Sequence, residues 1–175
     1  MRSLNEVTEL CFMPMQLADL DAVLAIESES HIHPWTRGNF SDSLAAAHWA
    51  YCIRPNLDQG KETPGTFLDS HVLWAYCILY PAVDELHLLN ITVAPKLRKL
   101  GLGARIMEAI EGVAAQQKMP RIILEVRATN EPAYALYKKL GYEQIGARKG
   151  YYPANPETGT REDAIVMAKS IKLES

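Results

Sequence analysis

Two closely spaced glycines mark the segment of this sequence with the clearest chemical potential. Gly101 and Gly103 follow the basic residues Arg98 and Lys99 in the segment RKLGLGA, at the start of an apolar-periodic stretch. Such a loop before a helix directs unpaired backbone N–H groups and the positive helix end toward one point, and glycines permit close approach. The segment therefore predicts an anion site, with phosphate as the expected ligand. The same residues also fit a tight turn with two solvated cations, because short glycine motifs are weak signals.

The elements on either side of the glycines support the phosphate interpretation. Leu102, Ile106, Ile110 and Val113 recur at helical spacing and predict a helix over residues 102–117. Upstream, the apolar segment ELHLLNITVAP, residues 85–95, is typical of a largely buried strand that stops at a proline. Two familiar phosphate motifs are excluded, because the dinucleotide fingerprint needs a third glycine at Ile106 and the P-loop ending is absent.

The rest of the chain alternates strand and helix signals. Thr36 is a candidate N-cap for one short helix and Asn130 for another, which would end at Gly141. In order, we expect a strand over 8–14, helices over 16–28 and from 36 to 44, strands over 48–54, 71–81 and 85–95, a helix over 102–117, a strand over 121–126, a helix over 130–142 and two strands within 142–170, with a polar loop over 55–70. This order predicts a mixed α/β fold with one central sheet.

Composition limits the classes of function. The 175 residues are 48% hydrophobic and 22% charged with a formal charge of -3, as in ordinary soluble single-domain proteins. This charge argues against binding of nucleic acid over the whole surface, and no apolar run approaches the length of a membrane span. The three cysteines lack metal-binding or redox spacing, so we expect no metal site and reduced thiols in a cytoplasmic protein.

Three segments together resemble the GNAT superfamily of N-acetyltransferases. RKLGLGA, after a strand ending in NITVAP, fits the pyrophosphate loop of that superfamily. LEVRATNEPAYALYKKLGY, residues 124–142, resembles the branch that acetylates protein N-termini. HPWTRGNF, residues 33–40, and GYYPANPETGTREDAIVMA, residues 150–168, are similar to the bacterial enzymes that acetylate the N-terminal alanine of a ribosomal protein. The resemblance covers nearly the whole chain and omits the 55–70 loop, whose role is open.

The resemblance implies a fold and a donor. It implies one GNAT domain over residues 1–175, with a mixed central sheet of about six to seven strands flanked by about four helices. Acetyl-CoA would be the acetyl donor, with its pantetheine arm paired along the backbone of one strand. Asn130 would touch the cofactor, although its role as a helix N-cap is equally compatible with the sequence. The cofactor-binding residues implied are Ile91, Thr92, Val93, Arg98, Lys99, Leu100, Gly101, Leu102, Gly103, Ala104 and Asn130.

Acetyl transfer to an amine needs a base and an acid. Glu125 is the candidate general base, because it alternates with Leu124 and Val126 on a strand whose two faces we expect helices largely to cover. An ordinary glutamate on a solvated strand face is the alternative. The resemblance implies Tyr137, in the ALY before LGY, as the acid for the departing thiolate, with Tyr134 as its rival and a core aromatic as the plain alternative. A backbone N–H of residues 91–93 would polarise the thioester carbonyl, and no covalent enzyme intermediate is needed.

The acceptor side rests on the resemblance alone. It implies a basic small-subunit ribosomal protein with an N-terminal alanine, bound by Trp35, Tyr151 and Tyr152, with Glu162 and Asp163 meeting its arginines. Trp35 equally fits a core position, and exposed acidic pairs are usually only solvated. Rival functions are acetylation of other protein N-termini or of small amines, or acyl-CoA binding without catalysis, since a fold does not fix a function. The sequence gives no oligomeric state.

Overall fold

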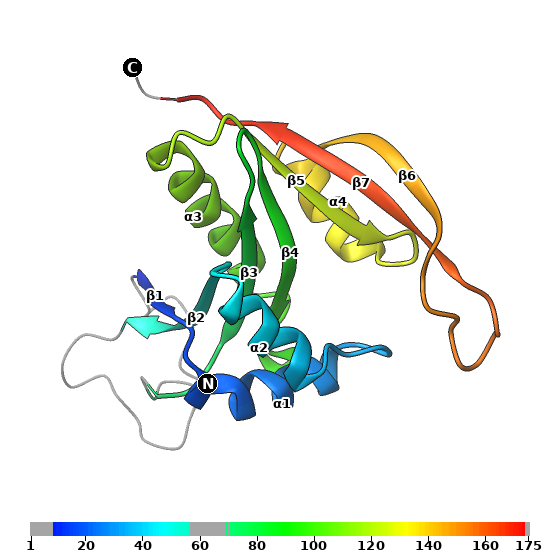
Figure 1. The fold of residues 1–175 in the computed structure, drawn as a ribbon, viewed down its shortest axis with the longest axis horizontal. Helices are drawn as coiled ribbons and strands as arrows, with labels where there is room; N and C mark the ends of the chain where they lie inside the picture. Colours follow the sequence, from blue (N-terminus) through cyan, green and yellow to red (C-terminus); the bar gives the residue numbers. More distant parts are fainter. Residues whose placement is uncertain (1–8, 57–68, 70, 174–175) are drawn as a thin grey trace. The chain divides into compact units, whose positions relative to one another are not determined.

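The computed structural model describes residues 9–56, 69 and 71–173, and these contain seven strands and four α-helices (Figure 1). They are β1 (Glu9–Pro14), α1 (Leu20–Ser30), α2 (Arg37–Ala45), β2 (Trp49–Asn56), β3 (Ala75–Pro81), β4 (Leu86–Val93), α3 (Leu102–Gln116), β5 (Arg121–Arg127), α4 (Glu131–Lys139), β6 (Glu143–Tyr152) and β7 (Glu162–Ser170). The short 3-10 helices η2 (Leu17–Asp19) and η3 (Pro95–Leu97) precede α1 and α3. The strands form one sheet in the order β1-β2-β3-β4-β5-β7-β6. The predicted mixed α/β class and element order are confirmed.

The chain divides into two compact units. The first takes the described residues up to 78 together with 90–102, and the second takes 79–89 together with 103–173. In the first unit β1 pairs antiparallel with β2, from Glu9 opposite Asn56 to Pro14 opposite Tyr51. Apolar side chains of α1, α2, β2 and β3 form its core, namely Leu20, Val23, Ile26, Phe40, Ala50, Cys52, Tyr76 and Ile78. Helices α1 and α2 therefore bury their apolar sides on this part of the sheet.

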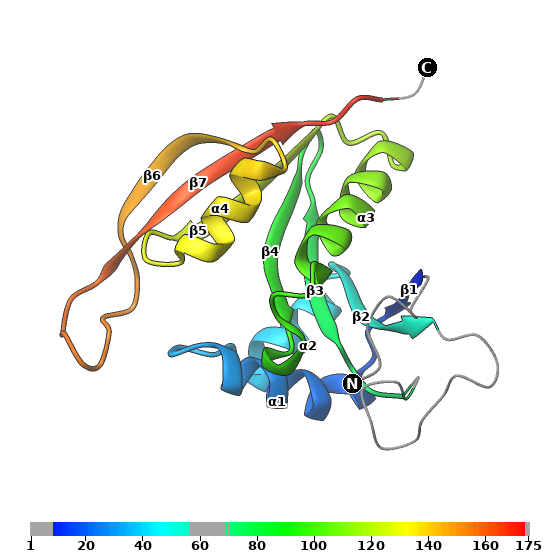
Figure 2. The same cartoon turned by 180° about the vertical axis from the view of Figure 1, so that it is seen from behind.

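The second unit is built on β5, β7 and β6. β5 runs parallel to the start of β4, β7 runs antiparallel to β5 along its whole length, and β6 pairs with β7 with two register shifts. Ile122, Leu124 and Val126 of β5 are buried, while the residues between them are partly exposed. Figure 2 shows α4 lying over β5 and β7. The Lys169 ammonium of β7 donates to the Glu111 carboxylate of α3 at 2.7 Å, which ties that helix to the sheet.

Most predicted boundaries agree with the structure to within a few residues. Thr36 caps α2 by accepting from the Asn39 N–H, and Gly141 ends α4 with a φ of 88°. The predicted helix over 16–28 begins as the 3-10 helix η2 and extends to Ser30. The predicted 55–70 loop is wrong at its start, because residues 55 and 56 belong to β2 and pair with β1. Residues 57–68 and 70 of that loop, like residue 8 of the predicted first strand, lie outside the described residues.

Candidate active site

Residues 91–93 form the end of β4, and their side chains differ in burial. Thr92 is buried, and its hydroxyl lies 2.8 Å from His31 Nε2 and donates to Asn90 Oδ1 at 3.3 Å. Ile91 and Val93 are partly exposed. The Val93 carbonyl accepts from the Arg98 guanidinium at 3.1 Å, so this end of the strand is fixed to the loop that follows it.

The loop after β4 turns sharply before α3. Lys99 has a φ of 63° and Gly101 a φ of 80°, both in the left-handed region, where a non-glycine residue is uncommon. Leu102 begins α3 and is buried beside Trp74 and Leu97, which anchors the start of the helix. This geometry leaves the first N–H groups of a 15-residue helix at the loop, as an anion site requires.

Three residues at or near the start of α3, namely Arg98, Gly101 and Gly103, have roles that the sequence did not reveal. The Arg98 guanidinium donates to Ser30 Oγ at 2.6 Å, so it stabilises the loop from within the first unit. Gly103 lies in the first turn of α3, where a Cβ would come 3.1 Å from Leu136 Cδ2 of α4. The absence of a side chain at Gly103 thus gives room to a neighbouring helix, whereas Gly101 supplies a positive φ in open space.

Glu125 lies on the partly exposed side of β5. Its side chain is 28% exposed, so this face of β5 is covered only in part. The Glu125 carboxylate accepts from the Arg148 guanidinium at 2.7 Å. Because β7 separates β5 from β6 in the sheet, Arg148 reaches Glu125 over the intervening strand.

The two tyrosines of α4 lie in different surroundings. Tyr137 is buried, with its ring centroid 5.9 Å from that of Tyr142, whereas Tyr134 is partly exposed. Burial, and secondarily the Tyr152 hydroxyl, raises the pKa of Tyr137 to about 12. Its phenol therefore remains protonated throughout the neutral range. Asn130 caps the helix by accepting from the Ala133 N–H at 3.3 Å, which confirms the N-cap interpretation of this residue.

An arginine guanidinium stacks over the ring of each of the two adjacent tyrosines at the end of β6. Arg148 lies 3.9 Å from the ring centroid of Tyr151, and Arg127 lies 4.0 Å from that of Tyr152. The two rings meet edge to face at 5.1 Å. Burial, and then the charge of Glu125, raises the pKa of Tyr152 to about 12. This cluster brings three predicted site residues, Glu125, Tyr151 and Tyr152, into one part of the second unit.

The acidic pair beside this cluster already has partners. The Glu162 carboxylate accepts from the Thr129 N–H at 2.8 Å and from Arg127 at 3.1 Å, while Asp163 accepts from the Gly150 N–H at 2.7 Å. Burial raises the pKa of Glu162, but the hydrogen bonds from Thr129 and Arg127 outweigh it and lower the pKa overall. The Asp163 carboxylate thus holds the end of β6 and the Glu162 carboxylate holds the end of β5, which is a different use from the expected contact with substrate arginines.

Trp35 lies in the first unit, in the turn between α1 and α2. Its ring packs on the core, 5.3 Å from the Phe40 ring, and remains partly exposed. Its backbone N–H donates to the buried carboxylate of Glu27 at 2.8 Å. Sequence reasoning missed Glu27 and Arg148 because long-range contacts decide their roles; a glutamate among the apolar residues of α1 was the only signal available for Glu27.

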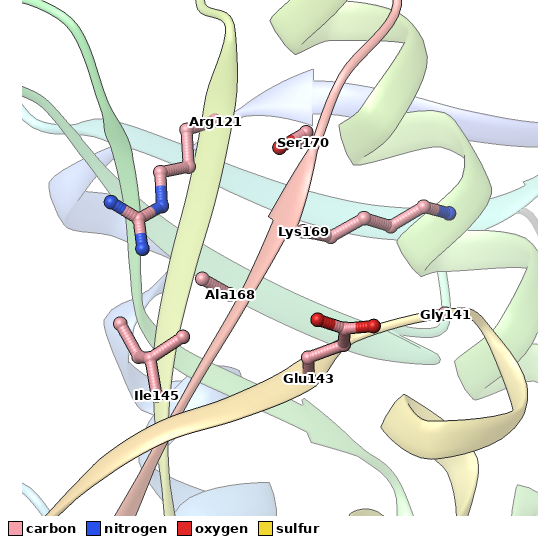
Figure 3. A pocket seen from close by; sticks show the side chains of 7 residues that line it. All are labelled: Arg121, Gly141, Glu143, Ile145, Ala168, Lys169 and Ser170. Atoms are coloured by element: carbon pink, nitrogen blue, oxygen red, sulfur yellow. The ribbon is translucent and has the colours of Figure 1, made fainter.

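A surface hollow lies at the other end of β5 and β7 (Figure 3). No predicted site residue lines it, and its lining residues are Arg121, Gly141, Glu143, Ile145, Ala168, Lys169 and Ser170. Among the residues that the structure describes, no group of three or more histidine, cysteine or acidic side chains is placed to hold a metal ion. Within the same residues, no helix is long and apolar enough to span a membrane.

Known proteins resemble this chain along most of its length. Residues 20–142 match the sequence profile described as the Acetyltransferase (GNAT) family. The ribosomal protein bS18-alanine N-acetyltransferase of Escherichia coli is 31% identical over 159 residues, 91% of this chain and 96% of the relative, and that of Salmonella typhimurium is 30% identical over the same shares. The crystal structure of the Escherichia coli ribosomal-protein-S18-alanine N-acetyltransferase superposes with a TM-score of 0.78 at 29% identity and covers 95% of this chain and 97% of that one.

Fold and similarity together define an acyltransferase. The chain belongs to the acetyltransferase (GNAT) family, and it is an N-acetyltransferase with acetyl-CoA as its donor. The predicted family, fold class, enzyme class and cofactor are thereby confirmed.

Proposed function

We propose that this acetyltransferase transfers the acetyl group of acetyl-CoA to the α-amine of an N-terminal alanine on a ribosomal protein, the small-subunit protein bS18. The observation that carries the proposal is similarity over nearly the full length to relatives named for that reaction. Such an acceptor is made in the cytoplasm, where we propose that the protein acts. We propose further that residues 1–175 form one acetyltransferase domain, for which the single seven-stranded sheet is the support.

In the proposed reaction, Glu125 is the general base. An N-terminal ammonium has a pKa of about 8 and must lose a proton before its nitrogen can attack. Glu125 is the acidic residue of β5, and its carboxylate is partly exposed to solvent beside Tyr151. It can therefore take that proton directly or through one water. The amine nitrogen then attacks the thioester carbon, the C–S bond breaks to release the CoA thiolate, and the attacking nitrogen gives its second proton to water to leave the neutral amide.

Tyr137 is the proposed partner of that thiolate. A CoA-like thiol has a pKa of about 8.5, below the value of about 12 to which burial raises the pKa of Tyr137. The phenol is therefore a weaker acid than the thiol, so it donates a hydrogen bond to the sulfur as the C–S bond breaks, and any proton that it transfers there is regained from water. A backbone N–H of residues 91–93 is the proposed donor to the thioester carbonyl.

Acetyl-CoA itself is assigned to the residues around the loop. We propose that the backbone of residues 91–93 pairs with the pantetheine arm and that residues 98–104 bind the diphosphate. The positive φ values of Lys99 and Gly101 and the helix start at Leu102 support this assignment. Asn130 keeps its amide nitrogen for the cofactor while its Oδ1 caps α4.

For the acceptor, we propose contacts with Trp35, Tyr151 and Tyr152. All three are at least partly exposed aromatic side chains, and aromatic residues are favoured where a peptide is bound. The Arg161 side chain donates to the carbonyls of Gly150 and Tyr151, at 2.6 and 3.2 Å, so the backbone of the tyrosine pair is held in place.

Mass spectrometry of peptides incubated with the protein and acetyl-CoA tests the function. The set contains the alanine-initiated N-terminus of bS18, the same peptide with a blocked amine, and peptides with other first residues. We expect acetylation of the free alanine peptide only. Acetylation of many N-termini would keep the chemistry and widen the acceptor class, and no acetylation, with acetyl-CoA still bound, would reject the proposal.

A further inference from the structure

Glu27 is a buried carboxylate that the proposed chemistry does not use. It lies in the last turn of α1 and is 1% exposed. Its two oxygens have three partners: Oε1 accepts from the Trp35 backbone N–H at 2.8 Å, Oε2 accepts from the Tyr76 hydroxyl, and Oε2 lies 3.3 Å from His31 Nε2. Burial, and then the hydrogen bond to Glu27, raises the pKa of Tyr76, so its hydroxyl stays a donor.

These contacts connect two segments of the first unit. Trp35 belongs to the turn between α1 and α2, which carries a proposed acceptor contact. His31 Nε2 also lies 2.8 Å from Thr92 Oγ1 on β4, whose backbone is proposed to bind the pantetheine arm. One carboxylate, through His31, therefore joins the turn 31–36 to the segment 90–93.

Stability alone is a weak reason for such a residue. Removing a carboxylate from water is costly, and well-packed apolar replacements of buried charged groups are often neutral or stabilising. A hydrogen-bonded carboxylate instead fixes positions, because its two oxygen atoms hold the donor groups at defined places. In α1, the apolar neighbours Val23 and Ile26 already supply the packing against the core. The contact with the Trp35 N–H is the one that acts on the backbone of the turn.

We infer that Glu27 is a positioning residue for the acceptor, which fixes the turn containing Trp35 through the Trp35 N–H. The inference rests on the proposed function, since the acceptor contact of Trp35 is part of it. Without a side-chain acceptor at position 27, the turn loses the hydrogen bond that ties the Trp35 backbone to α1, and the Trp35 ring is no longer held in one place. The expected result is weaker acceptor binding with unchanged acetyl-CoA binding.

Three variants separate positioning from packing. Glu27→Met fills the space but cannot accept from Trp35; Glu27→Gln keeps an amide oxygen that can. Tyr76→Phe removes another hydrogen bond to the same carboxylate and leaves the turn alone, so it is the matched control. We expect Glu27→Met to raise the acceptor KM about tenfold, and both other variants to stay within about threefold of the native value, with the acetyl-CoA KM constant throughout.

Hydrogen exchange of the Trp35 backbone amide supplies a readout without catalysis. It should be faster in Glu27→Met and near native in Tyr76→Phe. Equal exchange in those two variants, or an acceptor KM that Glu27→Met leaves unchanged, would overturn the inference. If the native protein acetylates no alanine peptide, the proposed function fails by itself, and the exchange comparison alone then decides whether Glu27 positions the turn.

Discussion

The Glu125 carboxylate and the Arg148 guanidinium form an ion pair at 2.7 Å, and the same guanidinium lies over the Tyr151 ring. Burial, and then the hydrogen bond to Glu125, raises the pKa of Tyr151, while the hydrogen bond to Glu125 raises that of Arg148. Arg148 therefore stays a cation at every working pH. It orients the proposed base and a proposed acceptor contact together.

Arg148→Met should lower kcat/KM for the acceptor peptide about tenfold, because the proposed base and Tyr151 lose their common partner. Acetyl-CoA affinity and melting temperature should change little, since exposed ion pairs contribute little to stability. Arg148→Lys should recover part of the loss, and Lys149→Met, an exposed neighbour, should resemble the native enzyme. Steady-state kinetics with each substrate varied checks this; native kinetics in Arg148→Met would show that the ion pair has no role in transfer.

Glu125→Gln should reduce turnover by roughly a hundredfold or more, because the amide cannot accept a proton from the amine. The affinity for acetyl-CoA, measured by calorimetry, should stay close to native, since the proposed cofactor contacts lie elsewhere. Arg148→Gln is the matched control, because it breaks the same ion pair and keeps the carboxylate. An active Glu125→Gln variant would remove Glu125 from the mechanism.

Local signals predicted the fold well because each one has a local physical cause. Thr36 and Asn130 were found as N-caps since a side-chain oxygen three residues before an N–H satisfies it regardless of the rest of the chain. At Gly101 the sequence predicted close approach of a ligand and did not predict the positive φ. Boundaries were less accurate at β2, where pairing with β1 extends the strand through Pro55, a residue that the sequence assigned to a loop.

Site residues were harder to predict because their roles depend on distant partners. Glu125 and Arg148 are 23 residues apart in sequence, and Glu27 and Tyr76 are 49 apart. No periodicity encodes such pairs. Gly103 shows the same limit, since the sequence suggested close approach of a ligand and the structure shows that a Cβ at this position would crowd Leu136.

Tyr137→Phe and Tyr134→Phe compare the two candidate acids directly. We expect Tyr137→Phe to lower kcat by roughly tenfold to a hundredfold without weakening acetyl-CoA binding, because only the buried hydroxyl is lost. Tyr134→Phe, at a partly exposed position, should be nearly native. Single-turnover acetyl transfer measures both; a larger loss in Tyr134→Phe would assign the acid to that residue.

Alkaline pH should weaken the fold through its buried tyrosines. The pKa of Tyr137 is about 12 in the folded protein and about 10 when unfolded. Because folding raises this pKa, the associated stability is complete below pH 10 and is lost as pH rises through 12, by about 1.4 kcal/mol per pH unit for one such group. Urea unfolding between pH 9 and 11 should therefore show a shallower pH dependence in Tyr137→Phe than in the native protein, and equal slopes would contradict this.

The two loop glycines should respond differently to alanine. At Gly101 an added Cβ would meet open space, so the free-energy cost of alanine comes only from holding it at a φ of 80°. This cost is about 1 kcal/mol and acts on the loop itself. Gly101→Ala should therefore weaken acetyl-CoA binding about fivefold to tenfold with little change in core packing. At Gly103 the Cβ meets the flexible end of Leu136, so Gly103→Ala should act mainly on stability. Calorimetric titration with CoA and thermal unfolding of both variants separate these effects. A larger loss of CoA affinity in Gly103→Ala than in Gly101→Ala would mean that Gly103 lies closer to the diphosphate.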